Sequence, residues 1–257
     1  MFVHCLAGRW PNWLEQLPVF AAEHRVIALD LPGFGHTPMP RWPSSDRSIS
    51  ISGYARLLDG LLEELGVDAG AFVGNSMGGF ISAELAIAFP QRVERLMLVS
   101  AAGLSTYRSP RLGRALRLLR LLEPFLAMGT ARGAAHAEAI ARRPGLRKVV
   151  LGSVIDRPEL MPAPLMAEVV RGGGTPGFPA ALEALHTYPL RDRLPEIACP
   201  TMIVWGKRDR LVSVRDADVF AELIPNSRKV VFEDTAHMAM LERPAAFNSL
   251  LKDFLNE

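Results

Sequence analysis

Cysteine and long apolar runs are scarce in this chain of 257 residues. The two cysteines, Cys5 and Cys199, are too few to form a framework of disulfides or a thiolate metal site. No apolar stretch is long enough to span a bilayer, and the sequence does not open with a charged segment followed by an apolar run. We therefore expect a soluble, cytoplasmic protein that does not insert into a membrane.

A strong excess of charge of one sign is also missing. The formal net charge of +2 is too small to predict a nucleic acid as a partner. Only 4 of the 29 basic residues are lysines, and we infer no function from that bias. Apolar residues make up 49% of the chain, which is enough for a buried core. The length fits one large α/β domain or a domain that carries an insertion.

The most informative stretch is Gly74–Gly79, with the sequence GNSMGG, because it fits the pattern G-x-S-x-G. A short apolar segment, Ala69–Val73, leads into it, and Phe80–Phe89 follows it with apolar residues at helical spacing. A strand, a tight turn and a helix predict a nucleophile elbow that presents Ser76 on a strained turn. The glycines let the backbone close in around that turn. The alternative is a glycine-rich turn that performs no chemistry.

Strand-like segments alternate with helical ones on both sides of this turn. Such alternation predicts an α/β fold with a mostly parallel, doubly wound sheet that helices cover on both faces. The predicted strands are Met1–Leu6, Arg25–Asp30, Ala69–Val73, Arg95–Ser100, Thr201–Gly206 and Arg228–Phe232. The predicted helices are Asn12–Ala22 with an interruption at Pro18, a helix from Ile51 that stops at Gly66, Phe80–Phe89, Val214–Leu223 and Pro244–Leu255.

The alternation stops at residue 103 and resumes near residue 199. We therefore expect residues 1–102 and 199–257 to form the core and residues 103–198 to form an inserted helical cap. The insertion holds 14 lysines and arginines against 8 aspartates and glutamates, which sets it apart from the core. Ser109 and Pro110 are expected to begin a helix there. Its arginines and leucines fit either an interfacial membrane helix or, the reading we favour, a solvated cap helix that covers the active site.

A serine nucleophile needs a base, and the base needs an orienting acid. Ligand sites in such sheets lie beyond the carboxyl ends of the strands. Asp209 and His237 each follow a predicted strand, and the chain order Ser76, Asp209, His237 is the one expected after a nucleophile elbow. Rival aspartates compete less well because two should lie within a helix and the third is too near His237 in sequence. These rivals are Asp216, Asp218 and Asp234.

An oxyanion hole should consist of two backbone N–H groups. One is expected from Met77, the residue after the serine. The other is expected from Leu6, in the loop that follows the first strand after His4 and Cys5.

Four landmarks of this chain resemble those of the α/β-hydrolase superfamily and occur in the same order. They are Asp30–Gly35, Gly74–Gly79, Trp205–Asp209 and His237–Pro244. The resemblance covers essentially the whole chain. It implies a serine hydrolase that uses a Ser–His–Asp triad beneath a helical cap and requires no metal and no cofactor.

Our first functional prediction is hydrolysis of a small carboxylic ester, through an acyl-enzyme, in a mostly apolar pocket. The alternative is a carbon–carbon bond hydrolase of ring-fission diketones, since Gly74–Gly79 and Ser100–Leu104 resemble that branch of the superfamily. That branch commonly has a tryptophan after its histidine, where this chain has Met238. A third reading is a non-catalytic ligand-binding protein on the same fold. It is less favoured because all three triad positions are filled.

The chain also departs from the superfamily in its first strands and near its site. Cys5 and Ala236 occupy positions where glycine is usual. The superfamily's sheet normally has two more strands before the one at Phe2, and these are expected to be missing. Either the gene start is misplaced, or the shortened sheet has an unpaired apolar edge, at which two copies of the chain could pair as a homodimer.

Overall fold

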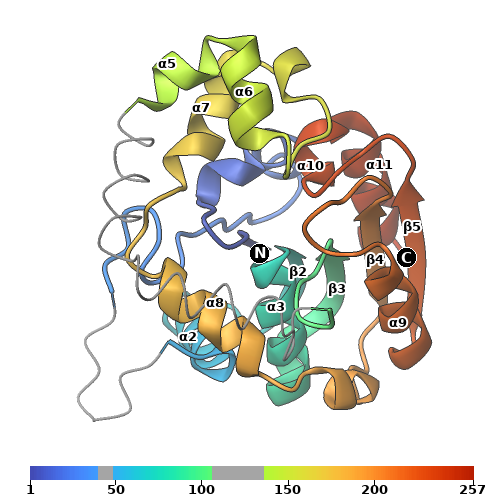
Figure 1. Ribbon diagram of the computed structural model, residues 1–257. Coiled ribbons are helices and arrows are strands. Elements are labelled where there is room, and N and C mark those ends of the chain that lie inside the picture. Colours follow the sequence, from blue (N-terminus) through green and yellow to red (C-terminus); the bar gives the residue numbers. More distant parts are fainter. Residues whose placement is uncertain (40–48, 106–135) are drawn as a thin grey trace.

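The computed structural model describes residues 1–39, 49–105 and 136–257. Within these residues a parallel sheet runs through the middle of the molecule (Figure 1). Its strands lie side by side in chain order: β1 (Phe2–Val3), β2 (Gly70–Asn75), β3 (Val93–Val99), β4 (Thr201–Gly206) and β5 (Ser227–Phe232). Helices precede or follow the strands, so the predicted α/β class with a mostly parallel sheet is confirmed.

The segment predicted as a strand over Arg25–Asp30 forms only one bridge, a parallel pairing of Ala28 with Phe2. The N–H of Phe2 donates to the carbonyl of Ile27 at 2.8 Å. Its partner β1 is only two residues long, so a longer ladder cannot form. After β1 the chain thus passes to one side of this strand, where Ala28 pairs with it, and then returns as β2 on the other side of β1. This reversal is the switch point at which ligands bind in open α/β sheets.

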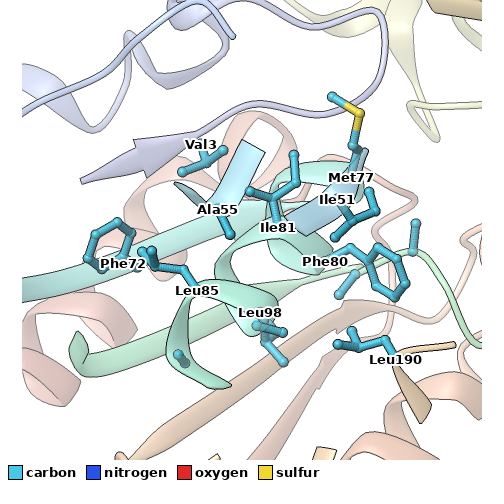
Figure 2. Packing of buried hydrophobic residues seen from close by; sticks show 14 of the residues in the cluster. Val3, Ile51, Ala55, Phe72, Met77, Phe80, Ile81, Leu85, Leu98 and Leu190 are labelled. Atoms are coloured by element: carbon cyan, nitrogen blue, oxygen red, sulfur yellow. The ribbon is translucent and has the colours of Figure 1, made fainter. Parts of the chain in front are cut away.

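Alternate residues of the strands enter two separate hydrophobic clusters, one on each face of the sheet. Phe72 and Leu98 join the cluster that contains α2 (Ile51–Glu64), α3 (Met77–Ala88) and α9 (Arg215–Leu223). Figure 2 shows Phe72 and Leu98 beside Ile81 and Leu85 of α3. Val73, Met97 and Val99 face the cluster that contains α10 (Ala239–Glu242) and α11 (Pro244–Leu255). The sheet is therefore covered on both faces, as strands with few polar residues require.

The helix boundaries follow local signals in the sequence. The hydroxyl of Ser50 accepts from the N–H of Gly53 at 3.0 Å and caps α2. Gly66 has φ of 62° just beyond the end of α2, as predicted for its stop. The predicted helix Asn12–Ala22 is instead two short pieces, η1 (Trp10–Trp13) and α1 (Leu17–Phe20). Proline is accepted in the first turn of a helix, so Pro18 opens α1 rather than interrupting a longer helix.

The described part of the insertion between β3 and β4 is helical, as predicted (Figure 1). Its division from the core at residues 102–103 and 198–199 stays a prediction, as do the unpaired sheet edge and the homodimer. The helix expected from Ser109 and Pro110, with its arginines and leucines, lies outside the described residues. Among the residues that are described, no helix combines the length and the apolar character needed to cross a membrane. The helices of the insertion, within its described residues, are α5 (Ala137–Ala141), α6 (Pro144–Leu151), η3 (Pro158–Leu160), α7 (Ala163–Arg171), α8 (Phe178–Thr187) and η4 (Arg191–Glu196).

Candidate active site

Ser76 lies on a sharp turn between the end of β2 and the start of α3, at the switch point of the sheet. Its φ of 56° and ψ of −114° are strained for a residue that has a side chain. A Cβ at Gly74 would lie 2.3 Å from the carbonyl oxygen of Gly78, so only glycine allows the turn to close. The serine is 7% exposed. This geometry agrees with the predicted elbow.

The first turn of α3 packs directly against the end of β1. A Cβ at Gly78 would lie 2.2 Å from the carbonyl oxygen of Val3. The loop after β1 contains Leu6 and turns back on itself, because the N–H of Gly8 donates to the carbonyl of Cys5 at 2.9 Å. Leu6 therefore lies in the loop that follows the strand end against which the first turn of α3 packs. Leu6 and Met77 both belong to the carboxyl edge of the sheet.

His237 and Asp209 form a hydrogen-bonded pair. The Nδ1 of His237 lies 2.7 Å from Oδ2 of Asp209, and their side chains are 4% and 0% exposed. The other carboxylate oxygen of Asp209 accepts from the N–H groups of Leu211 at 2.9 Å and Val212 at 3.0 Å. A carboxylate can only accept, so Nδ1 carries the proton and Nε2 of the neutral ring remains able to take one. The structure thus brings together the acid and the base that the sequence predicted.

Asn75 connects this pair to the elbow, and the sequence reasoning did not identify it. Its side-chain amide donates to the carbonyls of Val99 at 3.0 Å and of His237 at 3.1 Å. The N–H of Ser76 donates to the same Val99 carbonyl at 2.9 Å. The loops of the serine and the histidine therefore meet at one edge of the sheet. The signal available in the sequence was a polar residue at the end of an apolar segment, and in the fold this residue is fully buried.

His4 supports the loop that contains Leu6. Its Nδ1–H donates to the carbonyl of Cys5 at 2.7 Å, and its Nε2 accepts from the N–H of Leu31 at 2.9 Å. Burial lowers the pKa of His4 to about 4, so the ring stays neutral. Burial also raises the pKa of the Cys5 thiol to about 12. Cys5 is therefore an unreactive core residue at the position where the superfamily usually has glycine.

The rival aspartates are engaged elsewhere. Asp216 lies in α9, as expected, and accepts from the N–H of Ser105 at 2.9 Å. Asp218 and Asp234 form ion pairs with Lys229 and Arg243. In the part of the chain that the structure describes, no group of three or more His, Cys, Asp or Glu residues could hold a metal ion.

Comparisons with known proteins agree with this architecture. A family model described as the alpha/beta hydrolase fold matches residues 1–244. A 2-hydroxy-6-oxononadienedioate/2-hydroxy-6-oxononatrienedioate hydrolase of Cupriavidus pinatubonensis is 32% identical over 97% of this chain and 82% of its own length. The solved structure of Est816, an N-acyl homoserine lactone degrading enzyme, is 28% identical, has a TM-score of 0.73 and is matched over 98% of this chain and 91% of its own. An esterase from Exiguobacterium antarcticum has a TM-score of 0.78 at 22% identity over 100% of this chain and 91% of its own, a likeness of fold.

Proposed function

We propose that this chain, which belongs to the alpha/beta hydrolase fold family and is a hydrolase, cleaves a carbon–carbon bond next to the ketone of a ring-fission diketone acid. In this proposal Ser76 is the nucleophile, His237 the base and Asp209 the orienting acid. The observation that supports the assignment of roles is the buried 2.7 Å contact between His237 and Asp209, at the same sheet edge as the elbow serine.

The first step is attack of the Ser76 hydroxyl on the ketone carbon. Nε2 of His237 takes the hydroxyl proton while Asp209 holds Nδ1–H and stabilises the imidazolium. The carbonyl oxygen becomes an oxyanion, for which the N–H groups of Leu6 and Met77 are the proposed donors. The helix α3 begins at this point, so its positive end favours the developing negative charge.

The second step breaks the bond between the former ketone carbon and its neighbour. The bonding electron pair leaves with the neighbouring carbon, and the imidazolium of His237 returns a proton to the leaving fragment. A carbanion is a poor leaving group unless a second, conjugated carbonyl spreads its charge. The enol of a 2-hydroxy-6-oxodienoic acid becomes that carbonyl when its proton moves to the carbon beside the ketone, so the diketone form is the one that is cleaved. Water activated by His237 then hydrolyses the acyl ester on Ser76 and releases a carboxylic acid.

The choice of a carbon–carbon bond rests on the relative from Cupriavidus pinatubonensis. The compounds in its name are hydroxy-oxo diacids that contain no ester and no amide, so a hydrolase that acts on them must cleave between carbons. The chain aligns with that relative over 97% of its length. This support favours the alternative of the sequence analysis over its first prediction, ester hydrolysis.

Ester hydrolysis remains the second candidate, on two specific observations. Est816 is 28% identical to this chain and is named for degrading a lactone, which is a cyclic ester. Met238 follows the histidine here, where the carbon–carbon branch resembled by the sequence commonly has a tryptophan. The same serine, base and acid would serve, with an alkoxide in place of the carbanion as leaving group.

A direct comparison of substrates tests the proposal. The purified chain would be assayed with a 2-hydroxy-6-oxodienoic acid, whose conjugated absorbance disappears on cleavage, and with a panel of p-nitrophenyl esters. We expect a larger kcat/KM for the diketone acid, and a kcat lower by about 10⁴-fold or more in Ser76→Ala. A larger kcat/KM for any of the esters would overturn the carbon–carbon assignment in favour of the second candidate.

A further inference from the structure

The segment Gly152–Asp156, in the insertion between α6 and η3, contacts both loops that bear the proposed acid and base. The carbonyl of Val154, in the middle of this segment, accepts from the N–H of His237 at 3.1 Å. The opposite end of the same residue, the His237 carbonyl, accepts from Asn75 at 3.1 Å. The main chain of His237 is therefore held between the insertion and the strand that ends at the elbow.

Glu242 in α10 binds the same histidine loop from its other side. Its Oε1 accepts from the N–H groups of Ala236 at 3.0 Å and of Met238 at 3.2 Å. Its Oε2 accepts from the N–H of Asp156 at 2.8 Å and also from Ala236 at 3.2 Å. One carboxylate thus joins both neighbours of His237 to the insertion. Hydrogen bonds from backbone N–H groups to a charged oxygen are stronger than those to a neutral one.

The acid loop is tied to the same segment by the two residues that flank Asp209. Arg208 donates to Oδ2 of Asp156 at 2.6 Å, and Arg210 donates to the carbonyl of Gly152 at 2.9 Å. The side chain of Asp156 is 9% exposed, so solvent screens this ion pair less than a fully exposed one. The neighbours of Asp209 and the neighbours of His237 are therefore anchored on one stretch of five residues.

From these contacts we infer that the segment Gly152–Asp156 and the carboxylate of Glu242 in α10 together fix the orientation of the His237–Asp209 pair, with Glu242 and Asp156 as the positioning residues. The insertion is then a part of the catalytic framework as well as a cover over the site. Glu242 and Asp156 touch no reacting atom, and they act through the loops that they hold. This inference rests on the proposed roles of Ser76, His237 and Asp209.

The physical reason is the sensitivity of proton transfer to geometry. A displacement of about 1 Å at a catalytic group can lower a rate by about 100-fold. In Glu242→Gln the amide group must point its N–H₂ at some of the backbone donors that the carboxylate now accepts from. The histidine loop would then lose part of its support, while the substitution alters no group proposed to contact the substrate. A selective loss of kcat, with little change in KM, is the expected signature.

The experiment compares Glu242→Gln and Asp156→Asn with the matched variant Glu138→Gln. Glu138 forms an ion pair with Arg171 between α5 and α7, also in the insertion but touching neither loop. We would measure the thermal midpoint, kcat and KM on the best substrate, the rate of labelling by a fluorophosphonate, and the proton resonance of the His237 Nδ1–H. The resonance is identified by its loss in Asp209→Asn.

We expect kcat and the labelling rate to fall about 10-fold or more in Glu242→Gln and less in Asp156→Asn, with KM changed by less than about 3-fold. The Nδ1–H resonance should shift or broaden in both, and Glu138→Gln should match the wild type. A lower thermal midpoint with unchanged kcat, labelling and resonance would overturn the inference, because it is the result of a merely structural role. Retained turnover in Ser76→Ala would instead refute the proposed function itself.

Discussion

The side-chain amide of Asn75 donates a hydrogen bond to the backbone carbonyl of His237 across a distance of 3.1 Å. Asn75 immediately precedes Ser76, so one buried amide sets the distance between the nucleophile turn and the histidine loop. The same amide also donates to Val99 at the end of the neighbouring strand β3. The relationship predicts that Asn75 contributes to turnover as well as to stability.

Replacing Asn75 by alanine should lower the free energy of unfolding by about 1–3 kcal/mol, since two buried carbonyls lose a donor. It should also lower kcat by about 10-fold or more, because the histidine loop can shift. Asn75→Asp should be worse than Asn75→Ala at neutral pH, as a carboxylate would face two carbonyl oxygens. Urea unfolding and steady-state kinetics provide the measurements.

Asn248→Ala is the matched control for that change. Asn248 is an amide that donates to the carbonyl of Glu15 and accepts from Gln16, away from the site. Its loss should reduce stability and leave kcat within about 2-fold of the wild type. Equal losses of kcat in the Asn75 and Asn248 alanine variants would contradict a specific role for Asn75.

Removing a member of the proposed triad should lower turnover by several orders of magnitude. Ser76→Ala and His237→Gln should each reduce kcat by about 10⁴-fold or more, and Asp209→Asn somewhat less. The double variant of Ser76 and His237 should be no slower than the worse single variant, because the residues act as one unit. Turnover of Ser76→Ala near the wild-type level would rule out the serine mechanism.

His4 should make the fold sensitive to mild acid. Burial lowers its folded-state pKa from 6.5 to about 4, so between these values the unfolded chain binds the extra proton. Stability from the neutral ring is therefore complete above pH 6.5 and decreases as the pH falls towards 4, by about 3 kcal/mol in total. Urea unfolding at a series of pH values should show that the free energy of unfolding depends less steeply on pH in His4→Gln than in the wild type over this range.

A variant that removes no titratable group provides the comparison for His4. Asn248→Ala, in the amide side chain that donates to the carbonyl of Glu15, should keep the wild-type dependence of the free energy of unfolding on pH. If the free energy of unfolding changes with pH equally steeply in His4→Gln and in the wild type between pH 4 and 6.5, His4 does not titrate as its burial requires.

The glycine at position 78 should tolerate no side chain. In Gly78→Ala the new methyl would lie 2.2 Å from the Val3 carbonyl oxygen and 2.6 Å from that of His4, which is backbone that cannot yield easily. We expect a loss of about 1–3 kcal/mol or more in the free energy of unfolding, together with a loss of activity. Gly60→Ala, in an open position of α2, should instead gain about 0.5–1 kcal/mol. Thermal unfolding of both variants would check the contrast.

Local sequence signals predicted the central elements well. Strand β4 and helix α11 have the predicted boundaries, because prolines stand at their starts: Pro200 before β4 and Pro244 as the first residue of α11. The prediction of a strand over Arg25–Asp30 was wrong, because the partner strand β1 has only two residues and the segment forms a single bridge with it. Periodicity within a segment carries no information on the length of its partner.

The site was predictable to the extent that it follows strand ends. Asp209 and His237 were identified because each directly follows a strand, and the structure places them in contact. Glu242 could not be found in that way. The proposed positioning role of Glu242 depends on its hydrogen bond from the N–H of Asp156, which is 86 positions away in the chain. Only the folded chain brings these two residues together.

The insertion contributes apolar side chains to both buried clusters of the molecule. Ala141, Met166 and Val170 pack in the cluster of α11, and Leu185 packs in the cluster of α3. The insertion and the sheet should accordingly melt in a single transition. Excising the insertion, or grafting a foreign one in its place, would strip apolar surface from the rest of the molecule. Engineering of substrate scope is therefore better confined to side chains than to exchange of the whole segment.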